Sequence, residues 1–115
     1  QGKKIKVKDC TTLSKGKKVS FVTDTLVCDN AFTLAQNADI LFCESTYLED
    51  MEEQARERKH MTASQAAYIA KKAKAKKLVL IHFSQRYKDL SSFRKEAKKI
   101  FPSVFIGKDL QTFTL

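Results

Sequence analysis

The 115 residues are 43% hydrophobic, include no tryptophan and carry a formal net charge of +9. This length predicts one domain, and this hydrophobic fraction supports a packed core and excludes an intrinsically disordered chain. No apolar run approaches the roughly 18 residues that a membrane span needs, and no apolar stretch of a secretory signal follows the first lysines. We therefore expect one unit over residues 1–115, located in the cytoplasm and not bound to a membrane.

Three cysteines, Cys10, Cys28 and Cys43, are odd in number and widely spaced. A disulfide framework or a structural zinc knuckle would need closer, paired spacing. The pattern therefore favours reduced thiols, as expected in the cytoplasm.

The positive charge is unevenly distributed. The net charge is +6 over residues 1–18, −8 over residues 19–54 and +11 over residues 55–115. A lysine-rich surface is often only a solvated surface. The acidic block inside a basic chain, however, suggests carboxylates gathered around a cation, within a surface that attracts a polyanion.

The expected elements alternate between strands and helices along the chain. Short runs that are apolar, or rich in β-branched and aromatic residues, predict strands at 5–7, 19–22, 40–43, 78–81, 104–106 and 112–114. Helices are expected at 30–36, at 48–59, from the capping box Thr62–Gln65 onwards, and from Asp89 or Ser91 until Pro102 stops the last one. This alternation predicts an α/β fold in which neighbouring strands are largely parallel.

Three of the expected strands are followed by polar residues, namely Asp24, Glu44 and His82. In open α/β sheets the functional crevice lies at the carboxyl ends of the strands, and carboxylate with imidazole suits zinc or manganese. His60 precedes the start of a helix, where free N–H groups favour a phosphate. Each signal also has a structural reading, because Asp often forms turns and a lone His is often structural. Spacing alone leaves both readings open.

Four stretches of the sequence resemble ribonuclease Z, the metallo-β-lactamase-fold endonuclease family that trims the 3′ end of precursor tRNA. The set combines Glu-x-Thr, then His-x-Thr, then His-x-Ser-x-Arg-Tyr, in that order. The matching stretches are Thr23–Thr25, Ala38–Leu48, His60–Ala63 and Ile81–Tyr87.

The resemblance implies a role for each matching residue. Asp24 matches an aspartate that bridges two zinc ions, and His82 matches the last metal-ligand histidine; manganese is an alternative metal. His60 matches a histidine that contacts the scissile phosphate or protonates the leaving oxygen, and Glu44 matches the acid that orients it. By the same resemblance, three residues are expected to bind substrate: Thr62, Ser84 and Arg86.

The family's His-x-His-x-Asp-His motif is missing from the 115 residues. We therefore expect the C-terminal half of a metallo-β-lactamase-type αββα sandwich, with one mixed sheet and helices packed on one face. The other face would be left uncovered and would need the N-terminal half or a partner chain. The resemblance also implies precursor tRNA as substrate and a homodimer. Two alternatives stay open: another phosphodiesterase or hydrolase of the same fold, or a non-catalytic half-domain that binds RNA or a partner.

Overall fold

The computed structural model describes residues 4–6, 18–23, 29–107 and 112–114. Six strands are present in these ranges: β1 (Lys4–Lys6), β2 (Val19–Val22), β3 (Ile40–Glu44), β4 (Leu78–Ile81), β5 (Val104–Ile106) and β6 (Thr112–Thr114). They alternate with a 3₁₀ helix and four α-helices: α1 (Asp29–Ala35), η2 (Glu49–Met51), α2 (Glu52–Glu57), α3 (Ala63–Ala73) and α4 (Ser91–Lys98). No helix within the described ranges is long and apolar enough to cross a membrane.

The main sheet has four strands in the order β2-β3-β4-β5, and every neighbouring pair is parallel. Strands β1 and β6 form a separate antiparallel pair. The α/β prediction and the parallel neighbours are therefore confirmed. The expected single mixed sheet is instead two sheets among the described residues, because the antiparallel strands pair with each other.

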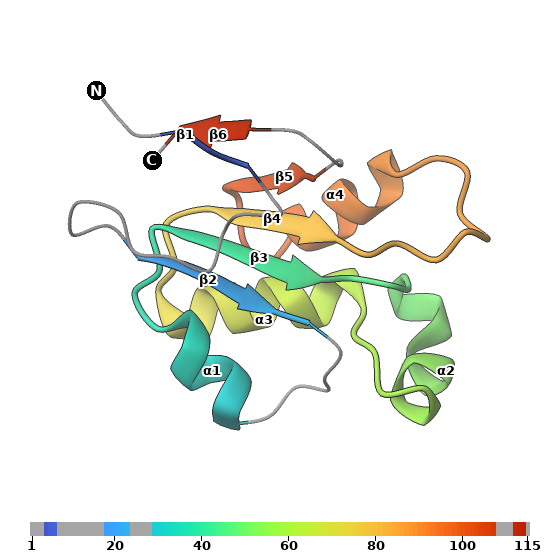
Figure 1. Cartoon of the computed structure of the whole chain (residues 1–115). Coiled ribbons are helices and arrows are strands. Elements are labelled where there is room, and N and C mark those ends of the chain that lie inside the picture. Colours follow the sequence, from blue (N-terminus) through green and yellow to red (C-terminus); the bar gives the residue numbers. More distant parts are fainter. Residues whose placement is uncertain (1–3, 7–17, 24–28, 108–111, 115) are drawn as a thin grey trace.

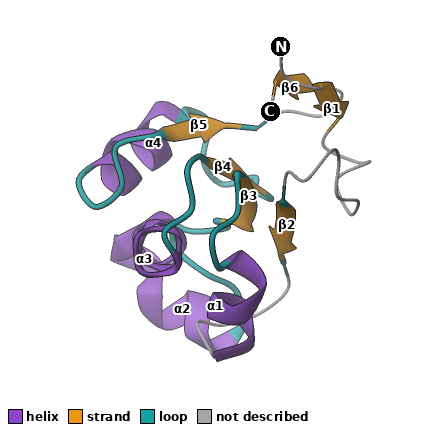
Figure 2. Cartoon of the chain, turned by 90° about the vertical axis from the view of Figure 1, so that its left-hand side faces the viewer, coloured by secondary structure: helices purple, strands orange, loops and turns teal. Residues whose placement is uncertain are grey.

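The helices cover one face of the main sheet (Figure 1). In the view along the strands, they lie on one side of the sheet, and β1 and β6 lie on the other (Figure 2). The core on the helix side combines the alanine face of α3 with apolar side chains of the strands and of α4, among them Leu41, Leu80 and Phe93. The small alanines let α3 lie close to the sheet.

The opposite face of the main sheet is apolar as well. A second cluster of buried side chains lies on this face, and Phe21 packs against it. The cluster consists of Val19, Ile40, Phe42, Val79 and Ile81. The expectation that this face is left uncovered is therefore wrong for these side chains, which are at most 7% exposed.

The helix predicted over residues 48–59 is divided. Glu49–Met51 forms a 3₁₀ turn, and α2 ends at Glu57. Lys59 then adopts a left-handed backbone with φ 59°, and the N–H of His60 donates to the carbonyl of Ala55 at 2.8 Å. Such a left-handed residue ends a helix and changes the direction of the chain. Because of this turn, the chain runs back towards the sheet at His60.

The capping box that begins α3 is confirmed. The Thr62 hydroxyl accepts from the N–H of Gln65 at 3.2 Å, and the Gln65 side chain accepts from the N–H of Thr62 at 2.9 Å. This reciprocal pair fixes where α3 starts. It also fixes the position of His60, two residues earlier.

Candidate active site

The candidate site lies at the carboxyl edge of the main sheet. Because β2, β3 and β4 are parallel, all three end at this edge, on the side where α2 lies (Figure 1). Glu44, the last residue of β3, is in register with Ile81, the last residue of β4. His82 follows directly, so the structure brings the predicted residues of these two strands to one edge.

A carboxylate–imidazole pair forms the centre of this site. Glu44 Oε2 lies 2.6 Å from His60 Nδ1, and the same oxygen accepts from the N–H of Met61 at 3.0 Å. The Glu44 side chain is fully buried, whereas 32% of the His60 side chain is exposed. The pairing of Glu44 with His60, residues 16 apart in sequence, is a contact that the resemblance implied.

The chemistry of this pair follows from its geometry. An ionised carboxylate only accepts hydrogen bonds, so the proton shared with His60 is placed on Nδ1. The other ring nitrogen, Nε2, makes no hydrogen bond with any described residue. In a doubly protonated ring both nitrogens are donors, so Nε2 then offers a proton on the side away from Glu44. The pair is therefore suited to present a proton or a positive charge to an anion at Nε2.

Two chain segments that run side by side hold this pair. The N–H of Thr46 donates to the carbonyl of Met61 at 2.9 Å, and the N–H of Ala63 donates to the carbonyl of Tyr47 at 3.0 Å. Tyr47 and Thr62 form a parallel bridge. The segment after β3 and the segment before α3 are thus joined by backbone hydrogen bonds. We call residues 44–49 and 60–64 the paired segments.

His82 is exposed and has a left-handed backbone, with φ 58°. Outside glycine this conformation costs about 1 kcal/mol and is enriched at functional positions. Asp24, the other predicted metal ligand, lies outside the described residues. Within the described ranges, no group of three or more His, Cys, Asp or Glu side chains could hold a metal ion. The described part alone therefore does not form a complete metal site.

Of the residues predicted to bind substrate, Ser84 and Arg86 lie on the loop after β4. The Ser84 N–H donates to the carbonyl of Thr46 at 2.9 Å, which ties this loop to the paired segments. The Arg86 guanidinium lies 5.8 Å from the centre of the Tyr47 ring, and Arg86 is exposed. This loop therefore lies beside the paired segments.

Thr62 is only 1% exposed, and its described hydrogen bonds are those of a helix cap. The first N–H groups of α3 are all occupied, because Ala63 donates to Tyr47, Ser64 to Glu96, Gln65 to Thr62 and Ala66 to Thr62. The expectation that this helix start holds a phosphate is therefore wrong for these groups. The role of Thr62 in substrate binding stays a prediction.

Several residues around the site were not identified from the sequence. Tyr87 accepts through its hydroxyl from the N–H of Leu48 at 3.1 Å, and Glu96 accepts from both Glu49 and Ser64. Glu96 is the one acidic residue in the otherwise basic helix α4. That isolated acid was the available signal, but its partners lie 32 and 47 residues away in sequence.

Ser45, directly after Glu44, has a fully buried side chain whose hydroxyl has no hydrogen-bond partner among the residues that the structure describes. Burial of an unpaired hydroxyl costs about 1–3 kcal/mol. We expect Ser45→Ala to raise the free energy of unfolding by about 1 kcal/mol, measured by urea denaturation. Ser103→Ala, at a half-buried position, is the control and should change stability by less than about 0.5 kcal/mol. A less stable Ser45→Ala protein would show that the hydroxyl has a partner in solution.

Cys43, the other neighbour of Glu44, is a free and fully buried cysteine. Burial raises the pKa of its thiol, and the charge of Glu44 raises it further. A buried thiol with a raised pKa is a poor nucleophile. That Cys43 is free confirms the expected reduced state of its thiol; Cys10 and Cys28 lie outside the described residues.

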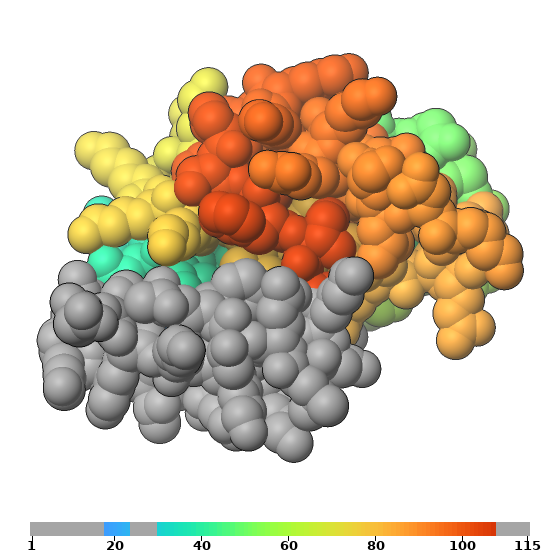
Figure 3. All heavy atoms as spheres, turned by 90° about the horizontal axis from the view of Figure 1, so that it is seen from above, coloured from blue at the N-terminus to red at the C-terminus, as the bar shows by residue number. Residues whose placement is uncertain are grey.

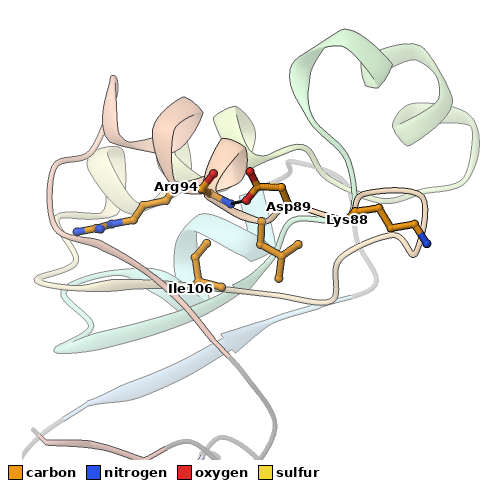
Figure 4. Close-up of a pocket in the computed structure, with 6 residues that line it drawn as sticks. Lys88, Asp89, Arg94 and Ile106 are labelled. Atoms are coloured by element: carbon orange, nitrogen blue, oxygen red, sulfur yellow. Dashed lines mark hydrogen bonds between the residues drawn. The ribbon is translucent and has the colours of Figure 1, made fainter.

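A shallow pocket lies apart from this site, between the loop after β4, α4 and β5, and none of the predicted site residues lines it. Asp89 accepts through Oδ1 from the N–H of Ser91 at 2.9 Å, and this bond lowers the pKa of its carboxyl. Lys88 and Arg94 extend in opposite directions from the pocket (Figure 4). The charged groups therefore do not converge on a common ligand.

Comparison with known proteins agrees with this fold. The profile of the beta-lactamase superfamily domain matches residues 10–83, which is more than half of the chain. The chain belongs to the β-lactamase superfamily. Its four-stranded sheet and helices are those of the metallo-β-lactamase fold.

Among individual proteins, the chain is similar to ribonuclease Z of Protochlamydia amoebophila, with 51% identity over 112 residues, which are 97% of this chain and 37% of the relative. It resembles the crystal structure of human tRNase Z, short form, with a TM-score of 0.68 and 31% identity, covering 89% of this chain and 34% of that one. The Bacillus subtilis metallo-β-lactamase fold protein YhfI gives a TM-score of 0.78 at 29% identity, covering 87% and 41%. The resemblance to ribonuclease Z is thus confirmed. The chain spans somewhat more than a third of the curated relatives it matches.

Proposed function

We propose that this chain is the C-terminal half of a zinc-dependent endoribonuclease that processes the 3′ end of precursor tRNA. The observation that carries the proposal is the Glu44–His60 pair at the carboxyl edge of the sheet, with His82 at the end of the adjacent strand. The 51% identity to a ribonuclease Z supports the same activity. By this proposal the complete protein cleaves a phosphodiester in cytoplasmic precursor tRNA and acts as a homodimer.

In the proposed reaction, His60 contacts the scissile phosphate or protonates the leaving oxygen through Nε2. Glu44 fixes the ring by accepting from Nδ1. Ser84, Arg86 and Thr62 are proposed to contact the substrate. The exposed Arg86 guanidinium suits a phosphate, since it offers several donors in one plane.

Asp24 and His82 are proposed to hold metal, with further ligands from the N-terminal half. Two zinc ions, or manganese in their place, would supply a nucleophile at neutral pH and stabilise the negative charge of the phosphate. The left-handed backbone of His82 supports this assignment, because strain of this kind is typically retained at functional positions.

The basic surface supports an RNA substrate. Between residues 71 and 99 all the Lys and Arg side chains are exposed, and the acidic residues there are Asp89 and Glu96. The end of α3 and the segment of α4 and β5 adjoin on one surface (Figure 3). The basic residues are Lys71, Lys72, Lys74, Lys76, Lys77, Arg86, Lys88, Arg94, Lys95, Lys98 and Lys99.

The proposal is tested by reconstitution. The purified 115-residue chain should bind RNA with an affinity that falls steeply with salt but should not cleave precursor tRNA with added zinc or manganese, since a catalytic zinc needs about three protein ligands. Addition of the upstream half, taken from the gene, should restore cleavage at the 3′ end of the tRNA.

Two outcomes would contradict the proposal. If the reconstituted protein binds RNA but never cleaves it, the chain belongs to a binding module. If it hydrolyses a small phosphodiester but not precursor tRNA, it belongs to another hydrolase of this fold. A reconstituted protein with His60→Ala is the control for contaminating nuclease.

A further inference from the structure

Glu96, on α4, connects the starts of two helices. Its Oε1 accepts from the N–H of Glu49 and its Oε2 accepts from the N–H of Ser64, each at 2.8 Å. Glu49 is the first residue of η2, and Ser64 is the second residue of α3. Each carboxylate oxygen therefore occupies a backbone N–H that has no partner within its own helix.

A carboxylate is well suited to this position. The N-terminus of a helix carries a partial positive charge, and a carboxylate that accepts from such an N–H forms a strong, charge-assisted hydrogen bond. The capping box already satisfies the N–H of Thr62 and Gln65 but leaves that of Ser64. Likewise, η2 has no side-chain cap on its preceding residue. Glu96 supplies both missing acceptors.

The two N–H groups belong to the paired segments, residues 44–49 and 60–64. At one end of these segments, Glu44 bonds to His60. Between the ends, the segments are joined by the backbone bonds of Thr46 and Tyr47. At the other end, Glu49 and Ser64 share the carboxylate of Glu96. The paired segments are thus closed at one end by the site itself and at the other end by a side chain of α4.

From this geometry we propose that Glu96 is a positioning residue that sets the orientation of His60 against Glu44. It does so by holding the paired segments in register, although it touches neither side chain of the pair. The consequence for turnover rests on the proposed function, whereas the consequence for His60 does not. Loss of one of the two bonds should let the segments shift and lengthen the Glu44–His60 hydrogen bond.

Glu96→Gln is the sharpest variant, because the amide oxygen accepts from one N–H while the amide NH₂ cannot accept from the other. We expect kcat of the reconstituted enzyme to fall about tenfold, with KM and bound metal unchanged. We also expect the NMR signal of the His60 Nδ1 proton to move upfield and to exchange faster with water. Glu57→Gln, on the exposed surface of α2, is the matched control and should change neither quantity.

A merely structural cap gives a different result. If Glu96→Gln lowers the melting temperature but leaves the His60 Nδ1 signal and kcat unchanged, the positioning role is wrong. If the His60 signal changes while the reconstituted wild-type protein cleaves no tRNA, the positioning role stands and the proposed reaction fails. If the Gln variant does not fold, Glu96→Asp is the alternative, because it keeps the charge but has a side chain shorter by one methylene. It should change kcat and the His60 Nδ1 signal in the same direction but by less.

Discussion

Replacement of His60 with alanine should slow cleavage of precursor tRNA by the reconstituted enzyme by about a hundredfold or more, the usual contribution of a general acid. Bound metal should stay unchanged, because the proposed function assigns the free Nε2 of His60 to the phosphate or the leaving oxygen and assigns the metal to other residues. The measurements are single-turnover cleavage rates together with metal analysis of the same preparation. This result would separate His60 from the metal ligands.

The buried carboxylate of Glu44 requires a second variant. His60→Ala removes a donor from a fully buried group, and such a change lowers stability as well as activity. His60→Gln keeps an N–H donor for Glu44 but supplies no titratable group, so it should fold well and be equally slow. Lys59→Asn, beside it, is the control, because Asn tolerates the left-handed backbone of this position. Loss of metal together with activity in both His60 variants would instead make His60 a metal ligand.

The sequence predicts the main sheet well because its strands are short apolar runs bounded by polar residues. Residues 78–81 and 104–106 form strands with the predicted bounds, and the capping box begins α3 where Thr62 places it. Local pattern was sufficient here, since each signal lies within a few residues of the element that it specifies.

Contacts between distant segments could not be predicted in the same way. Whether the first N–H groups of α3 are free depends on Tyr47 and Glu96, which reach them from other elements. The break between η2 and α2, and the left-handed Lys59, depend on how the turn packs rather than on helix propensity. The resemblance predicted that Glu44 pairs with His60. The hydrogen bonds by which Glu96 supports this pair are evident only in the three-dimensional structure.

The opposite sheet face gives a similar lesson about burial. Apolar side chains such as Phe42 and Val79 lie on the face away from the helices, and the resemblance to one half of a sandwich predicted that this face would be uncovered. They are nevertheless fully buried. A sequence pattern shows that a strand is apolar on both faces but not which segment covers the second face.

Replacement of His82 with glycine should remove bound metal and abolish cleavage while leaving the fold at least as stable as before. His82 has φ 58°, a conformation that glycine adopts without cost, so the substitution relieves about 1 kcal/mol of strain as it removes the imidazole. A histidine kept only for structure would give the opposite pattern, with lower stability and intact metal. The measurements are zinc content after dialysis, the cleavage rate and the urea midpoint.

Lys74→Gly is the matched control for this result, because Lys74 has φ 60° at the end of α3, remote from the carboxyl edge of the sheet. It should raise stability by a similar amount and leave bound metal and the cleavage rate at saturating RNA unchanged, while the loss of one charge from the basic surface weakens RNA binding. Asp24→Ala should reduce metal content more severely than the His82 variants, because an aspartate shared by two ions contributes to holding both charges. Full zinc occupancy in Asp24→Ala and His82→Gly would refute both ligand assignments. Loss of zinc in both variants would support the assignment of Asp24 and His82 to one metal centre.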